Sequence, residues 1–289
     1  MASMRDIKRR KGSIQSTQQI TKAMKLVSTV KLQRAKMNAE KTDSYFRCMY
    51  DTVNSILKRT KNLEHRYLKS GEAGKKAVIV ITSNRGLAGG YNSNVIKLIT
   101  RGELAKEDLA VYAIGKKGKE ALQKQYEIKA DYSEVIAEPA YVDAMAISRE
   151  VLASFEKGEI SEIYLAYTAF KNTVVHIPTL LKLLPVEVNQ EETEGGEGEQ
   201  EDNRALMNFE PEDEEALNLL IPKYITSLIY GGMIEAVASE NGARMQAMDS
   251  ATSNAEEMID NLTLLYNRAR QGSITQELTE IIAGANAIS

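Results

Sequence analysis

Residues 3 to 57 contain no proline and only one glycine, Gly12, and this feature restricts the fold more than any other. Residues that favour helices, namely Lys, Arg, Gln, Met and Ala, dominate the stretch, and Ser3 stands where an N-cap is expected. A single helix over these residues would be roughly 80 Å long. Because this length exceeds the width of a small domain, we expect a helix that needs a partner along its surface.

Apolar and small residues repeat along this helix with spacings of four and three. The stripe is narrow, and Arg10, Lys31 and Asn38 interrupt it. Such a stripe is typical of a two-helix coiled coil and not of a helix buried in a globule. The predicted seam consists of Ile7, Ile14, Thr17, Thr21, Met24, Ser28, Ala35, Thr42, Tyr45, Met49, Thr52 and Ile56.

The C-terminal segment supplies a partner helix. Pro211 stands near its first position with acidic residues in the first turn, while Pro222 and the pair Gly231-Gly232 are expected to kink or loosen it. Since the two helices lie at opposite ends of the chain, we expect antiparallel pairing; a helix packed on a globular core is the alternative. The predicted seam consists of Ala238, Asn241, Met245, Met248, Thr252, Ala255, Ile259, Leu262, Tyr266 and Ala269.

The middle of the chain alternates short apolar runs with helical stretches. Strands are predicted at 76–83, 109–115, 162–170 and 174–185, and helices at 92–105, 116–126 and 141–158. This rhythm predicts a small α/β domain with a mostly parallel sheet. The chain therefore divides into an N-terminal coiled-coil helix (1–60), a central α/β domain (75–190), an acidic flexible loop (191–208) and a C-terminal coiled-coil helix (209–289).

Cysteine and histidine usage argues against redox and metal chemistry. Cys48 is the only cysteine, so neither an internal disulfide nor a thiolate cluster can form, and the two histidines, His65 and His176, lie in separate segments. We therefore expect no metal site. His176 stands in an apolar run and is interpreted as a packed residue, with a role as a catalytic base as the alternative.

Charge is distributed unevenly. The first 41 residues carry a net charge of +9 although the whole chain carries −3. The basic N-terminus leaves two alternatives open, a nucleic-acid-binding coiled coil and a mitochondrial transit peptide. Because the helical pattern continues unbroken to about residue 57, we interpret this segment as part of the mature protein. No run of 18 apolar residues occurs, so no membrane-spanning helix is expected.

A glycine-rich loop, "TSNRGLAGGYN" at 82–92, follows the first apolar run and raises the question of a nucleotide site. Its glycines, Gly86, Gly89 and Gly90, fit neither the dinucleotide fingerprint nor the P-loop pattern, and "GKKGKEAL" at 115–122 fits neither. We expect a tight turn between strand and helix. A nucleotide-dependent enzyme built on this domain remains the alternative, and no cofactor is predicted.

Four motifs in the same order as in one known family span nearly the whole chain. They resemble the gamma subunit of F-type ATP synthases, and the two terminal motifs are long and specific. The motifs are "STQQITKAMKLVSTVKLQRAK" near the start, "TSNRGLAGGYN", "FKNTVVHIPTLLKLLP", and "NRARQGSITQELTEIIAGANA" at the end.

The resemblance implies a rotor shaft that catalyses no reaction itself. In this family the terminal helices form a coiled coil inside a hexamer of alternating alpha and beta subunits, and the α/β domain, with the epsilon subunit, sits on the membrane ring of c subunits. Proton flow turns the ring, and the shaft drives the beta subunits through successive conformations to make ATP. Charged residues on outward faces, such as Lys22, Lys25, Arg34 and Lys36, should make shallow contacts and suit an acidic segment of the beta subunit.

Residues that match the family's contact motifs are expected to touch these partners. Contacts to the beta subunit are predicted at Met24, Lys25, Arg244, Gln271, Thr275 and Glu277. Contacts to the epsilon subunit and the c ring are predicted at Phe209 and Glu210. The apolar tail "IIAGANAIS" is expected to sit in an apolar sleeve of the hexamer.

Departures from the family pattern carry expectations of their own. Ala88 stands where a cysteine is common and no dithiol segment is present, so thiol control is not expected, and the stretch 191–202 is unusually acidic. The resemblance further implies a peripheral protein at the cytoplasmic face of a bacterial plasma membrane. It would associate with the membrane only through the complex and bind no nucleic acid.

Overall fold

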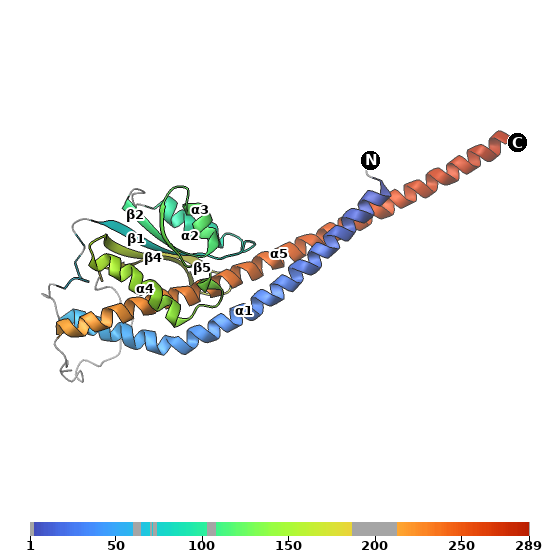
Figure 1. The fold of residues 1–289 in the computed structure, drawn as a ribbon. Coiled ribbons are helices and arrows are strands. Elements are labelled where there is room, and N and C mark those ends of the chain that lie inside the picture. The colour runs from blue at the N-terminus through green and yellow to red at the C-terminus, as the bar shows by residue number, and fades with distance from the viewer. Residues whose placement is uncertain are drawn as a thin grey trace. The chain divides into compact units, whose positions relative to one another are not determined.

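The computed structural model describes residues 3–59, 65–69, 71, 74–102, 108–186 and 213–288. The chain falls into two compact units, which are described separately. The first comprises residues 1–30 with 244–289, and the second residues 31–243. Two long helices contribute to both units: α1 (Met4–Arg59) and α5 (Asp213–Ile288). Figure 1 shows the elements. The division of the chain into four segments proposed from the sequence stays a prediction.

Helix α1 begins as the sequence predicted. The Asp6 amide donates to Ser3 Oγ over 3.3 Å, so Ser3 is the N-cap, and its hydroxyl also donates to the Asp6 carboxylate over 2.9 Å. This arrangement satisfies one of the amides that a helix N-terminus leaves without a partner.

In the first unit, α1 and α5 run antiparallel. Thr21 and Thr252 share a hydrogen bond of 2.8 Å between their hydroxyls, and Lys25 Nζ lies 2.5 Å from Asp249 Oδ1. Numbers rise along α1 as they fall along α5, which confirms the predicted direction. Basic-region helices that bind nucleic acid pair in parallel with a second chain, so this pairing within one chain argues against that alternative.

The predicted seam of α5 is confirmed. Each of its ten positions is buried or half-buried, whereas the positions between them are mostly exposed from Asp249 onward. Met248, Ala255 and Leu262 are buried, and Thr252 lies between them. The regular spacing therefore located the contact face correctly from Met248 to Ala269, whereas between Ala238 and Met248 most intervening residues are buried or half-buried as well.

The predicted α1 seam is confirmed at ten of its twelve residues, which are buried or half-buried, and is wrong at Thr17 and Tyr45, which are exposed. At these two positions, and where Arg10, Lys31 and Asn38 interrupt the predicted pattern, the next residue along the chain is the less exposed one. The sequence pattern allowed either neighbour, and the structure places Leu32 on the contact face where the predicted pattern has Lys31, although the same series includes Lys11 and Lys25. This series consists of Lys11, Gln18, Lys25, Leu32, Ala39, Phe46 and Val53.

The second unit contains a five-stranded sheet with the order β3-β2-β1-β4-β5. The first three neighbouring pairs are parallel and β4–β5 is antiparallel, which confirms a mostly parallel sheet. The sequence missed the short strand β3, in which polar residues alternate with apolar ones. The strands are β1 (Lys75–Ile81), β2 (Leu109–Ile114), β3 (Glu127–Asp131), β4 (Ile160–Phe170) and β5 (His176–Leu184).

Helices cover both faces of the sheet, which is why the strands read as continuous apolar runs. Along β1, Ile79 belongs to a core with α4 and α5, whereas Val78 and Val80 belong to a second core with α2 and α3. The two layers are visible in Figure 1. The helices are α2 (Tyr91–Thr100), α3 (Lys116–Leu122) and α4 (Tyr141–Glu156), and a 3-10 turn, η2, spans Val135–Ala137.

The expected weakening of α5 is not found. The helix continues through Pro222 and both glycines. A Cβ on Gly231 would lie 3.6 Å from the Phe46 ring, and one on Gly232 would lie 2.9 Å from Leu165 Cδ2. Gly232 therefore allows β4 to approach the helix closely, whereas a Cβ at Gly231 would make an ordinary contact with Phe46. The sequence pattern alone did not distinguish this packing role of Gly232 from flexibility.

Candidate functional site

All six predicted beta-contact residues belong to the first unit. Met24 and Lys25 lie on α1, and the other four lie on α5. Phe209, Glu210 and the acidic stretch 191–208 lie outside the described residues. Whether any of these residues contacts a partner stays a prediction, but the structure gives the surroundings of the first six.

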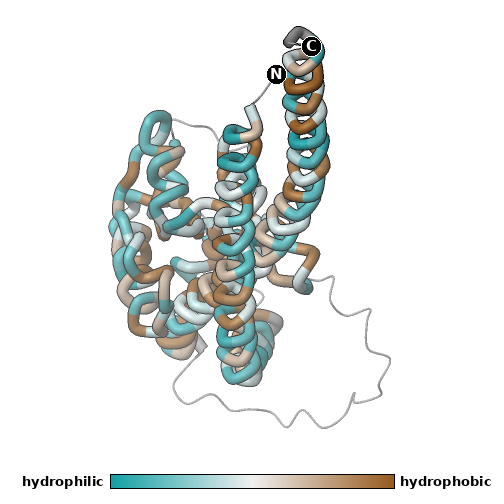
Figure 2. Tube along the Cα trace, turned by 90° about the vertical axis from the view of Figure 1, so that its right-hand side faces the viewer, coloured by the Kyte–Doolittle hydropathy of each residue, from teal (hydrophilic) through white to brown (hydrophobic). Residues whose placement is uncertain are grey.

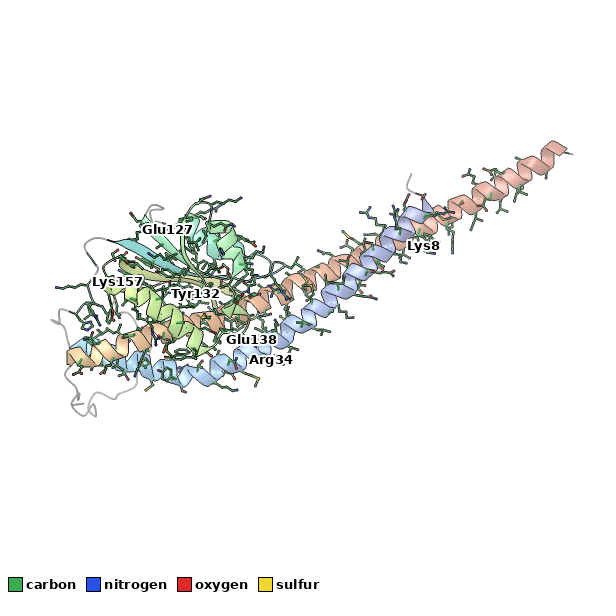
Figure 3. All side chains as sticks on the ribbon, in the orientation of Figure 1. Lys8, Arg34, Glu127, Tyr132, Glu138 and Lys157 are labelled. Carbon is green, nitrogen blue, oxygen red and sulfur yellow. The ribbon has the colours of Figure 1, made fainter. Side chains whose placement is uncertain are left out.

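The basic residues of α1 are not all directed outward. Lys22 and Arg34 are exposed as expected, and Figure 3 labels Arg34 on the helix. Lys25 instead is half-buried and paired with Asp249, and Lys36 Nζ lies 5.2 Å from the centre of the Phe170 ring. The expectation of a uniformly charged outer face is therefore wrong for Lys25 and Lys36, because both already have partners within the chain.

The four predicted residues of α5 differ in accessibility. Arg244 is only 8 % exposed, so little of its surface is left for another protein. Gln271, Thr275 and Glu277 are exposed. Gln271 and Thr275 stand four residues apart on one face, and the Thr275 hydroxyl donates to the Gln271 carbonyl over 2.9 Å. Glu277 projects from another face of the helix.

The outer face of α1 carries apolar residues that the sequence reasoning missed. Ile20, Leu26, Val27 and Val30 are 51 to 63 % exposed, on the side of the helix away from the buried Thr21 and Ser28. Their spacings of six, one and three residues, which place all four on one side of a helix, were the available signal. Large apolar side chains gathered on one helix face are typical of a surface that a partner covers.

The last turns of α5 also expose large apolar side chains. Residues 274–286 are all exposed, and among them Ile274, Leu278, Ile281 and Ile282 are 48 to 68 % exposed. These four follow a helical spacing of four, three and one. Apolar and polar residues alternate along this part of the helix in Figure 2. The stripe has no partner among the described residues.

A groove of about 1160 Å³ separates the start of α1 from α5 in the first unit. Ile7 and Leu262 contribute apolar side chains, whereas Arg9, Arg10 and Arg268 contribute positive charge. Asp6 is the acidic residue of the lining, and it already pairs with Arg9 over 3.1 Å. The groove therefore suits a segment that carries carboxylates.

The glycine-rich loop acts as a structural corner. The loop joins β1 to α2, and Gly89 within it has a φ of +56°. The first residues of the loop also accept hydrogen bonds from the first three amides of α3. The Lys116 amide donates to Asn84 Oδ1 over 2.9 Å, and the next two amides donate to the Ser83 carbonyl and to Thr82 Oγ1. The amides at the start of α3, which could otherwise bind a phosphate, are thus occupied by acceptors of the glycine-rich loop.

In the described part of the chain, no group of three or more His, Cys, Asp or Glu residues is placed to hold a metal ion. None of the described helices combines the length and apolar character needed to cross a membrane. Burial lowers the pKa of His176, which lies against α5, so the side chain packs in its neutral form.

Comparison with known proteins gives the family. A family model described as ATP synthase matches residues 3–288. The ATP synthase gamma chain of Lachnoclostridium phytofermentans is 65% identical over 291 residues, covering 100% of both chains. The sodium ion specific ATP synthase gamma chain of Acetobacterium woodii is 40% identical over 299 residues, covering 99% of both.

A solved structure supports the fold. A chain of the Euglena gracilis mitochondrial ATP synthase, in the part comprising OSCP, F1 and the c ring, aligns with a TM-score of 0.66 and 19% identity. The alignment covers 99% of this chain and 94% of that one. With its two long terminal helices, its central sheet and relatives that match it from end to end, this chain belongs to the family of ATP synthase gamma chains.

Proposed function

We propose that this chain is the central-stalk rotor of an F-type ATP synthase. It carries torque from a membrane ring of c subunits to a catalytic hexamer of alpha and beta subunits, couples proton flow to ATP synthesis, and catalyses no reaction itself. The observation that carries the proposal is the pair of antiparallel helices whose outer faces expose large apolar side chains, at Ile20 to Val30 and at Ile274 to Ile282. A chain of this family with such faces needs surrounding proteins to cover them.

The mixed character of the outer faces suits a part that turns against its partners. Apolar burial contributes about 25 cal/mol per Å², so a continuous apolar face would hold the shaft at one angle. On α1 the exposed apolar residues alternate with exposed charges such as Lys22 and Lys31. Each angle then favours one conformation of a beta subunit through a modest difference in contact free energy.

The proposed contacts follow accessibility. Gln271 and Thr275 offer an exposed polar pair to a beta-subunit loop, and the arginine-lined groove suits an acidic segment. Met24 and Lys25 are half-buried and would contact the beta subunit over part of their surface. Arg244 is nearly buried, so its main role would be to hold α5, the helix that also carries Gln271, in place. Glu277 is proposed as a further beta contact, and Phe209 and Glu210 as contacts to the epsilon subunit and the c ring.

The proposed location is the cytoplasmic face of a bacterial plasma membrane. The chain would be a peripheral protein there, held through the epsilon subunit and the c ring and without contact to nucleic acid. The family's role in an ATP synthase supports membrane association of the whole complex.

Gln271→Ala tests this site in the reconstituted complex. Because the amide would lose its hydrogen bonds to the beta-subunit loop, we expect ATP hydrolysis and proton pumping to fall about tenfold, while the isolated chain unfolds at the wild-type urea concentration. Gln123→Ala, which removes an exposed glutamine at the end of α3, is the matched control. Wild-type turnover of the Gln271 variant would remove the assignment, and heat of ATP binding to the isolated chain would favour the enzyme alternative.

A further inference from the structure

Helix α5 carries a stripe that faces the sheet of the second unit. Gly232, Glu235, Ser239 and Gly242 follow one another with spacings of three, four and three residues, and each lies against β4 or β5. Neighbouring Gly231 belongs to a different face, since it lies against Phe46 of α1. In this unit α5 therefore packs on two elements at once.

The end of β4 lacks a neighbouring strand on one side. Its pairing with β1 ends at Val80 and Ala166, but β4 continues to Phe170. Thr168 and Phe170 are two residues apart, so their backbone groups point the same way, as they do in any extended strand. Two polar groups on that side need partners that β1 does not provide.

Side chains of α5 take the place of the missing strand. The Phe170 amide donates to Glu235 Oε2 over 3.1 Å, and Ser239 Oγ donates to the Thr168 carbonyl over 3.1 Å. One residue thus accepts and the other donates, which matches what a paired strand would offer. The two hydrogen bonds tie the start of the β4–β5 hairpin to the helix.

On α5, closely packed glycines lie on either side of the two residues that make these hydrogen bonds. A Cβ on Gly232 would lie 2.9 Å from Leu165 Cδ2, and one on Gly242 would lie 2.6 Å from His176 Nε2. Glycine at both positions lets the helix backbone approach the sheet closely enough for short side chains to reach the strand. The contact is therefore built by four residues in one row.

Glu235 is an unusual choice for this position if only a hydrogen bond is needed. Burial raises its pKa above the ordinary value of 4.5, so the ionised carboxylate costs stability at neutral pH. Glutamine would offer the same acceptor without a charge. The titratable and charged groups around the strand end are Lys36 over the Phe170 ring, Tyr167 and His176.

We propose that Glu235 and Ser239 are positioning residues that clamp the β4–β5 hairpin to α5, so that torque on the α/β domain enters this helix directly. The inference rests on the rotor function proposed above. Helix α5 is continuous from Asp213 to Ile288, so a force applied at the clamp is carried along one uninterrupted hydrogen-bonded rod. Weakening the clamp should make the connection between the α/β domain and α5 more flexible, so that less torque is transmitted, without removing a contact to another subunit.

The double variant Glu235→Ala/Ser239→Ala in the reconstituted complex tests the clamp. We expect the Phe170 amide to exchange its hydrogen at least tenfold faster, and the proton gradient driven by ATP to fall by at least half while ATP hydrolysis is kept. Glu235→Gln should restore the gradient. It should also unfold at a higher urea concentration than wild type at pH 7, with the difference shrinking as the pH falls toward 4.5.

The outcomes separate this inference from the rotor function. If the wild-type chain forms a complex without coupled pumping, the rotor function fails. If the wild-type complex pumps and the double variant sustains the same gradient, the clamp has no role in transmission. Should the double variant fail to fold, Glu235→Ala alone removes the partner of the Phe170 amide, and an unchanged gradient with faster Phe170 exchange would overturn the proposal.

Discussion

Replacing Gly115 with alanine is expected to destabilise the α/β domain by about 3 kcal/mol or more. Gly115 connects β2 to α3 with a φ of +111°, a conformation that other residues rarely adopt. The new Cβ would lie 2.0 Å from the Thr82 carbonyl oxygen. Because that atom belongs to the backbone at the end of β1, it cannot move aside without disturbing the centre of the sheet. Urea unfolding of the isolated chain measures the effect.

Two other glycines of the chain provide matched controls. Gly89→Ala introduces a side chain at a φ of +56° into open space, so it should cost only about 1 to 2 kcal/mol. At Gly86 the φ is not positive and a Cβ would meet no atom within 4 Å. The free energy of unfolding of Gly86→Ala should therefore stay within about 0.5 kcal/mol of wild type. If Gly115→Ala were no worse than Gly89→Ala, the close approach of β2 and β1 at this corner would be contradicted.

The double variant Leu278→Asp/Ile281→Asp should weaken binding of the chain to the alpha/beta hexamer at least about a hundredfold. Both side chains are more than half exposed, at 55 % and 68 %, so the isolated chain should unfold as wild type does. In the complex the proposed apolar sleeve would bury them, and two carboxylates there would be costly. Titration of the labelled chain against the purified hexamer measures the affinity.

Thr279→Asp is the control for this effect. It adds one carboxylate within the same turn, half the charge of the double variant, but at a polar position whose hydroxyl is bonded to the Thr275 carbonyl of its own helix. We expect a loss of affinity well below that of the double variant. Equal losses would indicate a general effect of charge, and unchanged affinity of the double variant would exclude an apolar contact at this end of α5.

The sequence predicted the regular features of the fold because regular features leave periodic patterns. The seam of α5 from Ala238 to Ala269 and the strands β1, β2, β4 and β5 were all found in this way. On α1 the same method chose Thr17 and Tyr45 where the structure uses Gln18 and Phe46. Polar residues on both sides of the true seam left two registers open, and only the facing helix distinguishes them.

The exposure of individual side chains and the sites of close packing could not be predicted from the sequence, for a different reason. That Lys25 pairs with Asp249 depends on a residue more than two hundred positions away. The sequence pattern also did not show that Arg244 is nearly buried. Gly232 was expected to loosen α5, but it brings the helix against Leu165. The contact motifs assign the candidate site to α1 and α5, while the share of each residue's surface that is available to a partner required the three-dimensional arrangement.

Rotation of the chain itself is the most direct test of its role. A fluorescent rod attached to the exposed Cys48 of this chain, in a surface-fixed complex with the alpha/beta hexamer, would be followed during ATP hydrolysis. A rotor must turn in one direction in steps that follow the three catalytic sites. Steady ATP hydrolysis with the rod held at a fixed angle would contradict the account.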